Sequence, residues 1–137
     1  MVIGICDDEK NIRDMLEKHV KIICPGAEVL LFSSGKSLLS YTGNLDILFL
    51  DIQMEGIDGM AAARELRQKE NGVTIIFVTA LEEYVYQAFD VEAFHYLLKP
   101  FTWEKFDQVL KAALKKHTEE APEGTETERS FLVKCGN

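Results

Sequence analysis

The amino-acid sequence predicts an α/β fold in which a parallel β-sheet is covered by helices on both faces. Short apolar runs alternate with segments of helical periodicity five times along the chain, and strands that alternate with helices in this way build parallel sheets. The run Ile47–Leu50 is apolar at every position, as expected of a strand buried on both faces. Four of the five runs end in polar or charged side chains, which predicts a polar cluster at one edge of the sheet.

The individual elements follow from periodicity and from the residues that end them. We expect strands at residues 2–6, 28–32, 47–50, 73–78 and 93–98. We expect helices at residues 12–23, 35–39, 59–69, 82–89 and 103–116. Asp58 and Thr102 are suited to cap the third and fifth helices. Short right-handed connections leave few topologies for these elements, and the five-stranded flavodoxin-like order 2-1-3-4-5 is the leading one.

Composition limits the classes of function. The chain has 137 residues, of which 47% are hydrophobic and 28% charged, values typical of a globular domain. Its 15 basic and 23 acidic residues give a net charge of -8, which argues against nucleic-acid binding by this segment itself. No positively charged leader precedes the first apolar run, and no run is long enough to cross a bilayer. We therefore expect a cytoplasmic protein that does not associate with a membrane.

The residues that follow the strands suggest a specific chemistry. Asp7 and Asp8 follow the first strand, Asp51 the third, Thr79 closes the fourth, and Lys99 follows the fifth. Crowded carboxylates repel one another unless a cation neutralises them, and oxygen ligands of this kind suit Mg²⁺. A carboxylate nucleophile beside a metal, a lysine and a hydroxyl is equipped for phosphoryl transfer onto Asp51.

These residues belong to a longer pattern that resembles a known family. The pattern consists of Asp7-Asp8-Glu9, Leu50-Asp51-Ile52-Gln53-Met54, Gly56, Asp58-Gly59, Val78-Thr79-Ala80 and Lys99-Pro100-Phe101. Over residues 2–117 the chain resembles the receiver domain of bacterial two-component response regulators.

The resemblance implies roles for the acidic residues. Asp51 would accept a phosphoryl group from a histidine kinase. Asp8 would ligate Mg²⁺ directly, and Asp7 would do so mostly through water. Gln53 would contribute only its main-chain carbonyl to the metal.

The resemblance also implies a switch. Thr79 and Lys99 would hold the phosphoryl oxygens, and Tyr96, the switch aromatic, would rotate inward as Thr79 moves. The peptide bond before Pro100 would be cis. A homodimer favoured by phosphorylation, formed through the fourth helix, fifth strand and fifth helix, is what the family suggests.

The sequence of residues 77–101 resembles that of receivers that precede LytTR-type DNA-binding domains. We therefore expect a receiver domain at residues 1–117, an acidic linker at 118–130, and the start of a truncated output domain at 131–137. That output would act in transcription regulation, through DNA binding by a domain that this segment lacks.

Three alternatives share parts of this pattern. A haloacid-dehalogenase-like phosphatase also uses an Asp after a buried strand, but it needs a second Asp where this chain has Gln53. A nucleotide- or flavin-binding module would need a first loop rich in Gly, Ser and Thr, whereas Asp7-Asp8-Glu9 is acidic. A receiver-like module that is not phosphorylated is disfavoured because all five site residues are retained. We expect a phosphoacceptor and not an enzyme, apart from slow loss of its own phosphoryl group.

Overall fold

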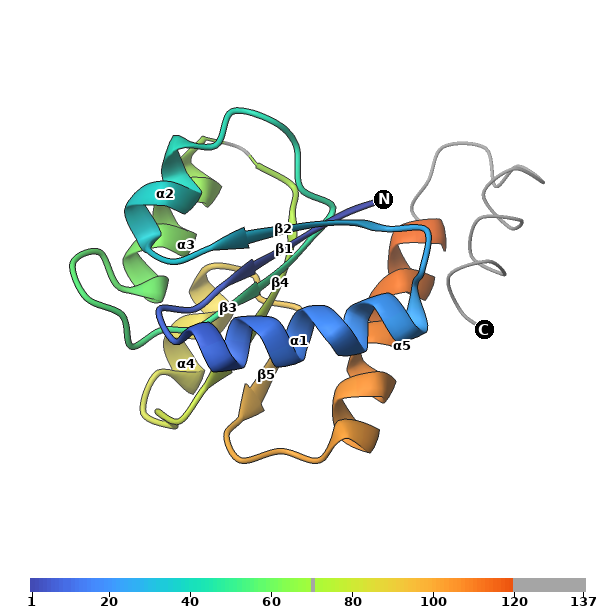
Figure 1. Cartoon of the computed structure of the whole chain (residues 1–137). Helices are drawn as coiled ribbons and strands as arrows, with labels where there is room; N and C mark the ends of the chain where they lie inside the picture. The colour runs from blue at the N-terminus through green and yellow to red at the C-terminus, as the bar shows by residue number, and fades with distance from the viewer. Residues whose placement is uncertain (70, 120–137) are drawn as a thin grey trace.

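The computed structural model describes residues 1–69 and 71–119. Strands and helices alternate along this part of the chain (Figure 1). The strands are β1 (Val2–Cys6), β2 (Glu28–Phe32), β3 (Ile47–Leu50), β4 (Thr74–Thr79) and β5 (His95–Leu98). The helices are α1 (Lys10–Ile23), α2 (Gly35–Ser40), α3 (Gly59–Gln68), α4 (Val85–Asp90) and α5 (Trp103–Glu119).

The five strands form one sheet in the order β2-β1-β3-β4-β5. Every neighbouring pair is parallel, so the predicted fold class and strand order are confirmed. All strands therefore end at the same edge of the sheet. Because β1 and β3 are direct neighbours, with Cys6 opposite Leu50, the residues that follow them must lie close together.

The core has two layers, one on each face of the sheet. Side chains alternate along β3, so that Ile47 and Phe49 pack with α1 and α5 on one face. Leu48 and Leu50 pack with α2, α3 and α4 on the other face. All four are at most 1% exposed, and full burial of such a side chain stabilises the fold by about 1.5–3 kcal/mol. The central strand is thus fixed from both sides, which holds its last residue firmly.

Two helix starts were predicted from their capping residues, and both caps are present. The Asp58 carboxylate accepts a hydrogen bond from the Ala61 amide at 2.8 Å and caps α3. The Thr102 hydroxyl accepts one from the Lys105 amide at 3.1 Å, at the start of α5. Such caps satisfy amides that have no partner within the helix.

Several boundaries differ from the expected ones by one to three residues, and two of the shifted starts have a clear cause. The fourth helix was expected from residue 82, but it begins at Val85 because residues 82–84 form a turn in which the Val85 amide bonds to the Glu82 carbonyl. The fifth strand was expected from residue 93, but it begins at His95 because the Ala93 amide still closes the end of α4 on the Ala88 carbonyl.

The last helix continues to Glu119 and includes the first two residues of the expected linker. The rest of the linker and the expected start of an output domain at 131–137 lie outside the described residues. Among the helices that are described, none has the length and apolar character needed to span a membrane.

Candidate functional site

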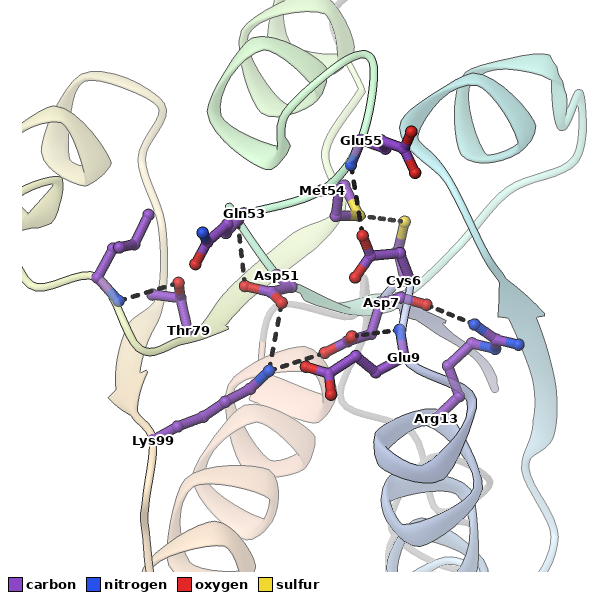
Figure 2. Close-up of polar contacts among 12 residues, drawn as sticks. Cys6, Asp7, Glu9, Arg13, Asp51, Gln53, Met54, Glu55, Thr79 and Lys99 are labelled. Atoms are coloured by element: carbon purple, nitrogen blue, oxygen red, sulfur yellow. Dashed lines mark hydrogen bonds and ion pairs between the residues drawn. The ribbon is translucent and has the colours of Figure 1, made fainter.

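An acidic cluster and a lysine meet at the carboxyl edge of the sheet (Figure 2). Oxygen atoms of Asp7, Asp8 and Asp51 all lie within 4.8 Å of one another. Lys99 reaches across from the end of β5, and its Nζ lies 3.0 Å from Asp7 Oδ2 and 3.2 Å from Asp51 Oδ2. The residues that the sequence placed at the ends of separate strands are therefore brought together.

Burial makes the ionised state of the carboxylates in this cluster energetically costly. Asp7 is 1% exposed and Asp51 is 5% exposed, whereas Asp8 lies at the surface. A buried carboxylate needs charge partners or hydrogen bonds to remain ionised. One ammonium group from Lys99 offsets only one of the three negative charges, so the site retains an excess of negative charge that favours a further cation.

The pKa values of the paired groups follow from the same arrangement. Burial raises the pKa of Asp51, and the nearby charge of Asp7 raises it further, although Lys99 and a hydrogen bond from Thr79 act in the opposite direction. Burial lowers the pKa of Lys99, but the charges and hydrogen bonds of Asp51 and Asp7 outweigh burial and raise it overall. Lys99 therefore stays positively charged at neutral pH. Additional positive charge near Asp51 would stabilise the ionised form of its carboxyl group.

The backbone of Glu9, which precedes α1, and a side chain of α1 hold Asp7 in place. Its Oδ1 accepts a hydrogen bond from the Glu9 amide at 2.9 Å, and its carbonyl accepts one from Arg13 Nη1 at 2.8 Å. Arg13 was not expected from the sequence, because a bond to a main-chain carbonyl leaves no pattern of residue types. These contacts fix the first acidic position before any metal or phosphoryl group binds.

The β3–α3 loop, residues 51–58, holds the other acids. The Gln53 amide donates to Asp51 Oδ1 at 3.3 Å, and the Glu55 amide donates to Asp8 Oδ2 at 3.3 Å. The position of this loop therefore decides where both carboxylates point.

A cleft of about 330 Å³ opens at this edge. Its lining residues are Asp8, Glu9, Asp51, Gln53, Ala80 and Lys99. Glu9 and Ala80 were quoted only as parts of longer motifs, and the structure adds them to the wall of the cleft. Carboxylate oxygens gathered around a hydrophilic cleft are the donor set that hard divalent ions such as Mg²⁺ prefer, so the residues present fit this metal.

Thr79 and Tyr96 are linked through the backbone of Leu81 in the β4–α4 loop. Thr79 is fully buried, and its Oγ1 accepts a hydrogen bond from the Leu81 amide at 3.2 Å. The Tyr96 hydroxyl donates to the Leu81 carbonyl, and its ring packs 5.9 Å from that of Phe77. Burial raises the pKa of Tyr96, so the hydroxyl remains a donor. Leu81 takes part only through main-chain atoms, and the sequence therefore gave no signal for it.

The Lys99–Pro100 peptide bond is cis, as the resemblance to receiver domains implied. Together, the five-stranded parallel fold, the acidic cluster and this lysine define the class of the protein, a receiver-type signalling domain. The family model described as the response regulator receiver domain matches residues 3–111. The chain belongs to this family.

Similar proteins include a sensory transduction protein and a regulatory protein. The sensory transduction protein LytT of Oceanobacillus iheyensis is 39% identical over 113 residues, which are 76% of this chain and 44% of that protein. The positive alginate biosynthesis regulatory protein of Pseudomonas aeruginosa is 36% identical over 121 residues, which are 82% of this chain and 47% of that protein. The chain thus spans under half the length of these two relatives.

Solved structures agree with the family. The response regulatory domain of protein mrkE from Klebsiella pneumoniae matches with a TM-score of 0.83 and 27% identity, covering 88% of this chain and all of that one. The response regulator TrrA from Thermotoga maritima, solved in complex with Mg²⁺ and BeF, matches with a TM-score of 0.73 and 31% identity. That match covers 82% of this chain and 97% of that one.

Proposed function

We propose that this domain is the phosphorylation-dependent switch of a two-component system, and that Asp51 is the residue that accepts the phosphoryl group from a histidine kinase. The observation that carries this proposal is the geometry at Asp51. Its carboxylate is buried at the end of the central strand, lies 3.2 Å from Lys99 Nζ, and shares a cleft with two further acids. A carboxylate held in this way is both positioned and electrostatically supported for nucleophilic attack.

The roles of the surrounding residues follow. Asp8 and Asp51 would hold Mg²⁺ directly, Asp7 mostly through water, and Gln53 through its main-chain carbonyl. The metal supplies positive charge that offsets the charge on the transferring oxygens. An oxygen of Asp51 forms a bond to phosphorus as the bond from phosphorus to the donor's imidazole nitrogen breaks. Lys99 is held in place by Asp7 and donates to a phosphoryl oxygen as the charge develops.

The switch connects this chemistry to the β4–α4 loop. The Thr79 hydroxyl accepts from the Leu81 amide, and Tyr96 donates to the Leu81 carbonyl. A phosphoryl group on Asp51 adds acceptor oxygens to which the Thr79 hydroxyl donates its proton. As Thr79 moves toward them, its distance to the Leu81 amide changes, and the Leu81 contacts change with phosphorylation. Two loop arrangements of similar energy, biased by one new hydrogen bond, are sufficient for a switch.

The surface that responds to this loop exposes apolar side chains. Tyr86 and Phe89 of α4 are 81% and 75% exposed, and Leu98 at the end of β5 is 40% exposed. Large apolar groups gathered on a surface favour association with a partner. We propose that phosphorylation favours a homodimer through α4, β5 and α5.

The output of the switch lies beyond the described residues. Two of the matched relatives are about twice as long as the region that matches this chain. The sequence of residues 77–101 also resembles that of receivers that precede LytTR-type domains. We propose that residues 118–130 link the receiver to a DNA-binding output domain that begins near residue 131 and regulates transcription. We propose that the segment itself, with a net charge of -8, binds no nucleic acid. We also propose that the protein is cytoplasmic.

No catalytic turnover is proposed beyond slow loss of the phosphoryl group from Asp51. A phosphatase of the haloacid-dehalogenase type would need a carboxylate at position 53 as its acid and base. Gln53 occupies that position on the rim of the cleft, and its neutral side-chain amide does not ionise near neutral pH, so it cannot act as that acid and base.

Intact-mass spectrometry tests the proposal. The chain is incubated with acetyl phosphate, with Mg²⁺ or with EDTA, and the expected result is a gain of one phosphoryl group that requires Mg²⁺. Asp51→Ala is expected to abolish the gain, whereas Asp14→Asn, on the exposed side of α1, is expected to retain it. A wild-type chain without a Mg²⁺-dependent gain would refute the proposal.

A further inference from the structure

Gly59, the first residue of α3, packs directly against the backbone of Asp51. A Cβ atom at position 59 would lie 2.0 Å from the Asp51 carbonyl oxygen and 2.8 Å from both its carbonyl carbon and Ile52 Cα. Non-bonded carbon and oxygen atoms do not approach this closely, since favourable contacts lie near 3.5–4.0 Å. The Gly59 amide also donates to the Ile52 carbonyl at 2.8 Å. Position 59 therefore needs a residue without a side chain because of space.

We propose that Gly59 is a positioning residue for phosphorylation. It allows the start of α3 to close on the backbone of the phosphoacceptor, and this contact sets the position of the segment 51–53. The inference rests on the proposed function and extends it to a residue that touches neither the metal nor the phosphoryl group.

The contact has little room to relax. On one side, Ile52 is 1% exposed and the Asp51 amide is bonded to the Cys6 carbonyl at 3.0 Å. On the other side, Met60 and Ala63 of α3 are fully buried. A methyl group at position 59 must therefore shift either the end of β3 or the first turn of α3.

Either shift reaches the site through the same segment. The Asp51 carboxylate is held by the Gln53 amide at 3.3 Å and by Lys99 at 3.2 Å, so a moved backbone changes both contacts. The main-chain carbonyl of Gln53 would move with them. A misplacement of about 1 Å can cost about a hundredfold in rate, which makes this contact important for function.

Gly35 provides a matched comparison. It begins α2 and faces the far end of the β3–α3 loop, where a Cβ atom would lie 2.7 Å from the Ile57 carbonyl oxygen and 3.0 Å from Ile57 Cβ. Gly35→Ala therefore introduces the same kind of backbone clash against the same loop, but away from Asp51 and Gln53. Gly26 has no heavy atom within 4 Å of a Cβ position, and Gly26→Ala serves as the control without a clash.

The experiment compares the wild type, Gly59→Ala, Gly35→Ala and Gly26→Ala in three measurements. The first is the amide shift of Gln53 by NMR in metal-free protein, which reports the hydrogen bond to Asp51. The second is Mg²⁺ affinity by calorimetric titration, and the third is the midpoint of thermal unfolding. The rate of phosphorylation by acetyl phosphate is measured alongside them.

We expect Gly59→Ala to move the Gln53 amide signal and to weaken Mg²⁺ binding by about tenfold or more, the usual effect of losing support around a metal site. Gly35→Ala should lower the unfolding midpoint but change the affinity far less, and Gly26→Ala should match the wild type. Equal affinities for Gly59→Ala and the wild type would overturn the inference. So would losses in Gly59→Ala and Gly35→Ala that scale only with their unfolding midpoints.

A second pair covers the case in which Gly59→Ala does not fold. Asp58→Ala removes the cap of α3 and loosens its first turn, whereas Asp58→Asn keeps a capping oxygen and removes the same charge. Weaker Mg²⁺ binding in Asp58→Ala than in Asp58→Asn supports the inference, and equal binding overturns it. A wild-type chain that binds Mg²⁺ but gains no phosphoryl group would refute the proposed function alone, since the Gln53 amide and the affinity series still decide the role of Gly59.

Discussion

Replacement of Lys99 by methionine tests how the buried charges at the site are balanced. Lys99→Met keeps much of the side chain's bulk but removes the ammonium group that lies 3.0 Å from Asp7 and 3.2 Å from Asp51. Asp7 and Asp51 are both buried, at 1% and 5% exposed. The variant thus leaves two buried acids next to each other without this partner.

The magnitude follows from these distances. At an effective dielectric constant of about 20, each pair attracts by about 5 kcal/mol, and most of that gain is offset by the cost of burying the charges. Removal of one partner from a buried pair typically destabilises a protein by about 3–5 kcal/mol. Since domains of this kind unfold with about 5–15 kcal/mol, the loss should be large but measurable.

The loss should also depend on pH. A carboxylate without its partner escapes the penalty by binding a proton, so the free energy of unfolding of Lys99→Met should fall as the pH rises and the proton is lost. Urea denaturation in EDTA, followed by circular dichroism at about pH 4.5 and about pH 7.5, measures this, because the loss accumulates above the ordinary aspartate pKa of about 3.9. The double variant Asp51→Asn/Lys99→Met removes one of the two unpaired acids and should recover part of the stability at the higher pH.

A loss of less than about 1 kcal/mol for Lys99→Met at the higher pH would refute this reasoning, because exposed ion pairs contribute no more than that. A loss that Asp51→Asn does not reduce would show that the two acids are not coupled through Lys99.

Two further predictions concern metal binding and association. Mg²⁺ should raise the unfolding midpoint more at neutral than at acidic pH, since burial raises the pKa of Asp51 and protonated Asp51 binds metal poorly. Calorimetry with and without EDTA measures this stabilisation. A stabilisation by Mg²⁺ that is equally large at acidic pH would contradict the prediction. Phe89→Glu should abolish the dimer of the phosphorylated domain in light-scattering measurements and leave phosphorylation intact. Ile22→Glu, at a position on α1 that is 61% exposed against 75% for Phe89, should still dimerise.

The sequence was sufficient to predict the position of the acids because that position depends on burial and topology. Ile47–Leu50 is apolar at every position, which identifies a strand covered on both faces. Once the strands are parallel, Asp51 must meet the acids that follow β1, because β1 and β3 are neighbours. Lys99 lies near Asp7 and Asp51 for the same reason, because β5 ends at the same edge of the sheet.

Contacts made by backbone atoms could not be predicted in this way. Leu81 binds Thr79 and Tyr96 through its amide and carbonyl, so its residue type carries no signal. Gly59 is required by a close approach from a residue eight positions earlier, which no local pattern reveals. Arg13 reaches a carbonyl of Asp7 for a similar reason.

Helical periodicity also overstated what is buried. By its spacing Met15 belongs to the apolar stripe of α1, but it is 46% exposed, while Leu16 and Val20 on the same helix are buried. The stripe is wider than the surface that the sheet and α5 cover. The predicted start of α4 was wrong because residues 82–84 are compatible with a helix. The turn that they form follows Leu81 directly, and Leu81 is contacted by Tyr96, which is distant in sequence.

Chemical trapping identifies the phosphorylated residue itself. Borohydride reduces an aspartyl phosphate to homoserine, and peptide mass mapping then locates the converted residue after treatment with Mg²⁺ and acetyl phosphate. We expect homoserine at position 51 and unchanged aspartate at Asp7 and Asp8. Conversion at Asp7 or Asp8, or no conversion in a protein that has bound Mg²⁺, would contradict it.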